Sequence, residues 1–158
     1  MKKYGFRIAI VVLVLILGLS IFYMVYVHVP YYNYHHKLDL IRNEICETNH
    51  YDYDGYFHAH HGKEVYYIIR VQENGKKYFA AFNEKKELID SLEGPFADEK
   101  KVIKAIEKKY KTHIDSLDVG YENNRFVYCQ KIMEEDKLTY VYYSLETGEF
   151  IKAYFIEG

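Results

Sequence analysis

The chain has 158 residues, with 23 acidic and 21 basic side chains and a formal net charge of −2 at pH 7. This length allows a membrane anchor followed by one ordinary domain or two very small ones. The weakly acidic balance, with no basic stripe, argues against a nucleic acid partner. Two cysteines, Cys46 and Cys129, are too few for a disulfide framework, and they are either one pair or two buried thiols.

The first expected element is a membrane-spanning helix over residues 6–29. Arg7 is the one charged residue in this stretch, and about 20 apolar residues are enough to cross the hydrocarbon core as a helix. Because Lys2, Lys3 and Arg7 flank its N-terminal end, the positive-inside rule places the N-terminus in the cytoplasm and the later residues outside the cell. Pro30 is expected to mark a kink or break after the span.

A cleaved signal peptide is the alternative to a retained anchor. Its hydrophobic region would be shorter and would end at small residues, which residues 24–36 (MVYVHVPYYNYHH) do not offer. We therefore expect residues 1–30 to form a short cytoplasmic tail and a single-pass anchor in the cell membrane. Removing the three cytoplasmic basic residues leaves 23 acidic against 18 basic side chains, so the extracellular part is near −5.

The remaining sequence contains an internal repeat with a shift of 62 positions. Residues 64–90 align with residues 126–152, and Val65, for example, falls on Val127. In both copies an apolar strand runs into a polar turn, a second strand follows, and a second turn leads to a last short strand. The same shift aligns residues 35–49 with residues 97–111, and both segments carry apolar residues at helical spacing.

Each copy is therefore predicted to be a helix followed by an antiparallel β-meander. In the first copy Val65, Tyr67, Ile69 and Val71 alternate with Tyr66, Ile68, Arg70 and Gln72, and the pair Asn74-Gly75 suits a tight hairpin. The fold class expected is α+β: an N-terminal transmembrane helix and two tandem modules, at residues 31–94 and 95–158. Each helix should pack on its meander, which buries one face and leaves the other available.

This layout and the closing segment SLETGEFIK (144–152), with its acidic-Thr-Gly turn, resemble the TseB-like (YpmB-type) proteins of Gram-positive bacteria. That family carries two PepSY-like modules with a cystatin-like fold outside a membrane anchor. The first copy departs from the pattern, because it has NEKKE (83–87) where the Thr-Gly turn would be. The resemblance implies a non-enzymatic regulator of cell-wall elongation, and so of peptidoglycan synthesis, that associates with a class B penicillin-binding protein. PepSY modules more generally are thought to restrain peptidases.

A search for catalytic residues is negative. None of the serines, which are Ser20, Ser91, Ser116 and Ser144, lies in a G-x-S-x-G turn. There is no glycine-rich phosphate loop and no H-E-x-x-H motif. Cys129 would need a histidine within hydrogen-bond reach to act as a thiolate, and nothing in the sequence places one there. We predict no enzyme activity, no cofactor and no small-molecule substrate.

Residues 50–61 hold four of the eight histidines. If residues 56–61 are extended, His58 and His60 project from one face and His61 from the other. Two imidazoles so spaced can chelate zinc or copper, and the candidate third ligands are His50, Asp52 and Asp54. No closed ligand set is visible, so the simpler interpretation is exposed histidines and no metal. A third interpretation is pH sensing, because imidazoles gain charge below about pH 6.5.

Two functional hypotheses follow. The first is an anchored binding module that holds a wall-synthesis enzyme through a sheet face, a strand edge or the membrane helix, and a peptidase-inhibitor role falls within this class. Its candidate contact residues are Tyr66, Tyr128, Tyr142 and Tyr143, for which ordinary strand packing is the alternative. The second hypothesis is a histidine-based metal binder or pH sensor. The oligomeric state stays open.

Overall fold

A computed structural model describes residues 2–134 and 137–157. The protein is α+β, with one long N-terminal apolar helix followed by two antiparallel sheets of four strands each. The chain divides into two compact units, the first ending at Asn43 and the second beginning at Glu44. The second unit contains both sheets. The predicted fold class is confirmed at this level.

The N-terminal helix runs without interruption through three segments, α1 (Lys2–Tyr23), η1 (Met24–His28) and α2 (Val29–Asn49). Among the described residues this is the one helix long and apolar enough to cross a membrane. The predicted break at Pro30 is wrong. A proline cannot donate to the carbonyl four residues earlier and its ring crowds that carbonyl, but η1 is a π-helical turn in which the Val29 amide donates to Met24, five residues back. This wider turn directly before Pro30 lets the helix continue.

The first sheet has the order β1-β2-β3-β4. Its strands are β1 (Asp52–His61), β2 (Val65–Glu73), β3 (Lys76–Phe82) and β4 (Leu88–Glu93). Asn74 and Gly75 join β2 to β3 with φ values of 49° and 79°, as the hairpin prediction requires. The predicted alternation along β2 is confirmed by its register with β3, in which Ile68 faces Ala81 and Ile69 faces Ala80.

Both faces of this first sheet are buried at its centre. Ile68 and Ile69, neighbours that point to opposite faces, are each 0% exposed, and Ala80 and Ala81 are also buried. The expectation that the meander leaves one face available is therefore wrong here. The reason is tertiary, because Ile68, Phe79 and Ala81 belong to a hydrophobic cluster that also contains residues of the second sheet.

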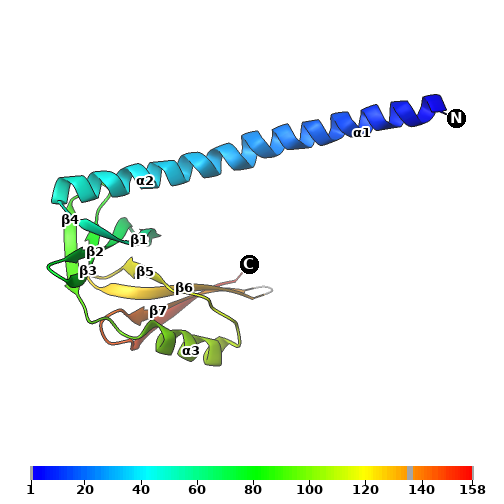
Figure 1. Cartoon of the computed structure of the whole chain (residues 1–158). Coiled ribbons are helices and arrows are strands. Elements are labelled where there is room, and N and C mark those ends of the chain that lie inside the picture. Colours follow the sequence, from blue (N-terminus) through cyan, green and yellow to red (C-terminus); the bar gives the residue numbers. More distant parts are fainter. Residues whose placement is uncertain (1, 135–136, 158) are drawn as a thin grey trace. The chain divides into compact units, whose positions relative to one another are not determined.

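The second sheet follows helix α3 (Glu99–Tyr110) and has the order β5-β6-β7-β8. Its strands are β5 (Asp118–Tyr121), β6 (Phe126–Glu134), β7 (Lys137–Ser144) and β8 (Phe150–Glu157) (Figure 1). Asp98 caps α3, since its side chain accepts a hydrogen bond from the Lys100 amide at 3.0 Å. Residues 135–136, part of the predicted turn of the second copy, lie outside the described residues. The repeat did not assign β1 or β5 as the first strand of each sheet.

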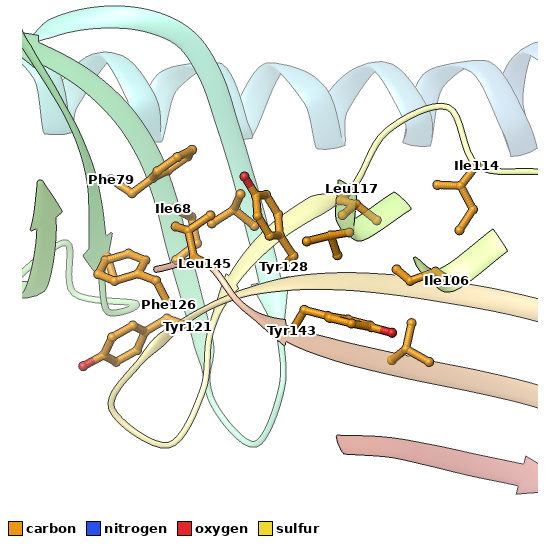
Figure 2. Packing of buried hydrophobic residues seen from close by; sticks show 14 of the residues in the cluster. Ile68, Phe79, Ile106, Ile114, Leu117, Tyr121, Phe126, Tyr128, Tyr143 and Leu145 are labelled. Carbon is orange, nitrogen blue, oxygen red and sulfur yellow. The ribbon is translucent and has the colours of Figure 1, made fainter. Parts of the chain in front are cut away.

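One hydrophobic core joins α3 and both sheets. Figure 2 shows Ile68 and Phe79 of the first sheet in the same cluster as Tyr128, Tyr143 and Ile106, the last from α3. The packing of α3 on its meander is thus confirmed. The two sheets are not independent, however, because their inner faces bury each other's side chains and would expose them if separated.

Polar contacts also fix the junction of the two sheets. The Tyr56 hydroxyl of β1 accepts a hydrogen bond from the Val119 amide of β5 at 2.6 Å. The Tyr121 hydroxyl donates to Asp90 Oδ2 at 3.0 Å, and the rings of Tyr66 and Tyr121 meet edge to face with centroids 5.2 Å apart. Strand β1, with its histidines, is consequently held against the second sheet.

Candidate functional site

The histidines of β1 divide between the two faces of the first sheet as predicted. His58 and His60 pair with Ile68 and Tyr66, on the face that meets the second sheet, whereas His61 pairs with Val65 on the opposite face. The three side chains differ in burial: His61 is exposed, His58 is half-buried and His60 is only 5% exposed. The interpretation of the cluster as exposed histidines is therefore wrong for His60.

His60 lies directly over Gly120 of β5. A Cβ at Gly120 would come within 2.5 Å of His60 Nδ1, so only glycine leaves room for the imidazole there. The same Nδ1 is 3.9 Å from the sulfur of Cys129 on β6. His60 Nε2 is buried and has no hydrogen-bond partner among the described residues. Sequence reasoning could not find this pairing, because 69 positions separate the histidine from the cysteine.

Burial keeps this pair uncharged. Burial lowers the pKa of His60, and the neighbouring His58 lowers it further, while Glu122 opposes the effect. Burial, with the negative charges of Asp118 and Glu122, raises the pKa of the Cys129 thiol to about 12. At neutral pH the thiol therefore stays protonated, whereas a cysteine nucleophile needs a thiolate. The structure does not join Cys129 to Cys46.

A cavity of about 250 Å³ opens beside this pair and is lined by the three β1 histidines, Asp118 and Cys129 among others. His58 Nδ1 lies 3.7 Å from Asp118 Oδ1. In the described part of the chain, however, no group of three or more histidine, cysteine, aspartate or glutamate side chains is arranged to hold a metal ion. Of the candidate third ligands, Asp54 is already bound to Arg70 and Lys77, both at 2.8 Å. The described residues thus offer no preformed metal site.

The tyrosines considered for partner binding are mostly part of the interior. Tyr128, Tyr142 and Tyr143 are each 6–7% exposed, and the Tyr128 hydroxyl donates to the backbone carbonyl of Ala97 at 2.9 Å. These three side chains are not available to a partner, which corrects that prediction in favour of strand packing. Tyr66 is half-buried, and its hydroxyl donates to Glu64 Oε2 at 2.6 Å on the surface.

A larger cleft, of about 810 Å³, also lies between the two sheets and shares no lining residue with the histidine cavity. Its wall combines the edge of β4, the turn between β5 and β6, and the segment from Ser144 to Ile151. The charged lining residues are Asp90, Arg125, Glu146 and Glu149. The segment from Ser144 to Ile151 contains the acidic-Thr-Gly turn identified in the sequence. The cleft itself was not predicted, because its wall comes from three separate parts of the chain.

The turn in this wall is held firmly. Gly148 has φ of 73°, and a Cβ at this position would lie 3.1 Å from the Ala97 side chain, so the turn requires glycine. The Ala97 amide donates to the Leu145 carbonyl at 2.8 Å, which ties the turn to the start of α3. This part of the wall is therefore tied to the start of α3, and the cleft carries three carboxylates and one guanidinium on its wall. No protein-family model, curated protein or solved structure matches this chain.

Proposed function

We propose that the protein is a single-pass membrane-anchored, extracytoplasmic binding protein that regulates cell-wall elongation by associating with a class B penicillin-binding protein. The observation that supports this most is the combination of a helix able to span the membrane with a two-sheet unit bearing a cleft of about 810 Å³. The acidic-Thr-Gly turn, on which the resemblance to the TseB-like family rests, forms part of that cleft.

The orientation is part of the proposal. Lys2, Lys3 and Arg7 at the start of the helix favour a cytoplasmic N-terminus, which puts both sheets outside the cell. Each sheet with the helix that precedes it would be one PepSY-like, cystatin-like module, with limits at residues 31–94 and 95–158. A binding role without catalysis is supported by the Cys129 thiol, which burial keeps protonated beside a neutral His60.

Crosslinking in living cells, followed by purification of the tagged full-length chain, tests the proposal. Three forms are compared with the parent: one with residues 8–27 replaced by an unrelated span, one with Glu146→Lys in the cleft, and one with Glu84→Lys. Glu84 is the matched control, because it is the repeat equivalent of Glu146 and is also exposed in the corresponding turn of the first sheet. Recovery of the elongation transpeptidase by the parent, the span replacement and Glu84→Lys, but less by Glu146→Lys, is the expected result.

Two other outcomes contradict parts of this proposal. If the span replacement loses the transpeptidase while Glu146→Lys keeps it, the membrane helix and not the cleft recognises the enzyme. If the parent recovers no wall-synthesis enzyme at all, the proposed function fails. A peptidase-inhibitor role would instead require that the protein inhibits a named protease.

A pH-dependent association is a second candidate, favoured by the buried His60. The charged and titratable groups around its ring are His58 and His61 on β1, Asp118 on β5, Glu122 after β5 and Cys129 on β6. In the protonated imidazolium both ring nitrogens carry an N–H, and the buried Nε2 has no acceptor among the described residues, at the point where the two sheets meet. Acid should loosen this junction. Equal recovery of the transpeptidase at pH 7.5 and pH 5.5 would rule the idea out.

A further inference from the structure

The four end strands of the two sheets are not equally protected. Unpaired backbone groups of an end strand invite another strand, and proteins usually cover such edges or guard them with charges, prolines or bulges. The end strands β1 and β5 lie against each other and are joined by the Tyr56 hydroxyl and the Val119 amide. On β4, the Ser91 amide already donates to the Asp90 side chain at 2.8 Å.

Among the described residues, the end strand β8 has β7 as its one paired strand. The ammonium of Lys137 on β7 lies 3.9 Å from the centroid of the Phe155 ring, so this charge is directed to an aromatic face of β8. Tyr154, Phe155 and Ile156 are each about half exposed, between 47% and 55%, and the strand contains no proline. Lys152 of this strand forms an ion pair with Glu122, with Nζ 2.6 Å from Oε2, and its Nζ donates a hydrogen bond to the Tyr154 hydroxyl at 2.7 Å. The charge of Lys152 is therefore already paired. The register shift opposite Tyr142 and Tyr143 affects the start of β8 and leaves residues 152–156 regular.

We propose that β8 pairs antiparallel with β8 of a second copy of this chain, with Tyr154 on the two-fold axis. In this register Tyr154 faces the same residue of the second copy, and Ala153 faces Phe155, so a small side chain lies beside a large one. Lys152 faces Ile156, and no like charges are directly opposed. Residues that face each other in an antiparallel pair must lie on the same face of the sheet. Residues 152 and 156 share one face and residues 153 and 155 share the other, so each proposed pair meets this requirement.

The sequence of β8 favours a second copy over an unrelated strand because the strand is self-complementary. A register centred one residue earlier, on Ala153, would set Ile156 against the irregular start of β8, where the face pattern changes. Five paired residues bury less than the roughly 1,200 Å² of a stable interface, so the dimer should be weak in dilute solution. Anchoring both copies in one membrane raises their effective concentration.

Disulfide trapping of the full-length chain in native membranes tests the pairing. The parent carries Cys46→Ala and Cys129→Ala, and Tyr154→Cys is added to it. Residues on the two-fold axis have Cα atoms about 4.5–5.5 Å apart, within the range of a disulfide. Ile156→Cys is the register control, because two copies of that residue would be about 14 Å apart at about 3.4 Å per residue. Ser91→Cys controls for collisions at the end strand β4, which lines the cleft.

The expected result is a disulfide dimer of Tyr154→Cys upon mild oxidation, with little dimer from Ile156→Cys or Ser91→Cys. Equal yields from all three variants, or none from Tyr154→Cys, would overturn the proposal. If Tyr154→Cys instead crosslinks to the transpeptidase, the edge belongs to that enzyme. The second-copy inference then fails although the proposed function stands.

A charge substitution tests the register without cysteine at the same residue. When Ile156→Lys is added to the Tyr154→Cys chain, the new ammonium group faces Lys152 of the second copy, and this like-charge pair occurs twice per dimer. We therefore expect about two- to thirtyfold less dimer. The matched control is Leu88→Lys, which adds the same charge at a comparably exposed position on β4. Both variants should keep the parent's thermal unfolding transition. An unchanged dimer yield with Ile156→Lys contradicts the register.

Discussion

Substitution of Gly120 by alanine tests the central contact between the two sheets. The new methyl group would lie 2.5, 2.6 and 2.8 Å from three atoms of the His60 imidazole, whereas such contacts are normally about 3.5–4.0 Å. The imidazole is 95% buried and has the Cys129 sulfur 3.9 Å away, so it can give way only by moving toward the adjacent cavity and losing its present contacts. We therefore expect a loss of about 1–3 kcal/mol in the free energy of unfolding, the range for overpacked cores.

The assay is equilibrium urea unfolding of the full-length chain in detergent at pH 7.5, followed by near-ultraviolet circular dichroism of the tyrosines. Gly62→Ala is the graded control, since its Cβ would approach the same imidazole only to 3.3 Å, at Nε2, which a small shift can relieve. In a double-mutant cycle, His60→Ala should remove most of the cost of Gly120→Ala, with a coupling energy of about 1–2 kcal/mol. Unchanged stability of Gly120→Ala, or additive effects in the cycle, would refute the contact.

Three further predictions concern ionisation and hydrogen bonding. Because the pKa of His60 is lowered in the folded state, the unfolded chain binds its proton more readily, so stability should fall as the pH drops below about 6.5. Urea unfolding at pH 7.5 and 5.5 measures this fall in the free energy of unfolding, and the fall should be smaller for His60→Gln than for the parent. Burial raises the pKa of Cys129 to about 12, so iodoacetamide at pH 8 should label it slowly until urea unfolds the chain, as mass spectrometry can measure. Tyr128→Phe loses the hydrogen bond to Ala97 and should cost about 0.5–1.5 kcal/mol, whereas Tyr66→Phe, whose hydroxyl bonds on the surface, should cost almost nothing in the same assay.

Local elements could be predicted because their signals lie within a few residues. The alternation along β2 and the Asn74-Gly75 turn each depend on neighbours in the chain, and the structure has both. The repeat also placed the last three strands of each sheet. It did not assign β1 and β5, because the aligned segments began after them.

The continuation of the helix through Pro30 shows the limit of a local rule. Proline disfavours the helix interior because of one missing donor and one crowded carbonyl. A single π-helical turn before it changes which carbonyl each amide meets, and the helix then extends to Asn49. The residue types around Pro30 do not predict this π-helical turn.

By itself the sequence determined the apolar span, the α+β class and the antiparallel order of the last three strands of each sheet, since hydrophobic periodicity and turn residues act over short distances. Only the tertiary structure decided which surfaces are buried. An internal repeat describes each copy separately and contains no information on how two sheets meet. The burial of His60 over Gly120, the interior position of Tyr128 and the cleft beside the Thr-Gly turn all depend on contacts between residues far apart in the chain.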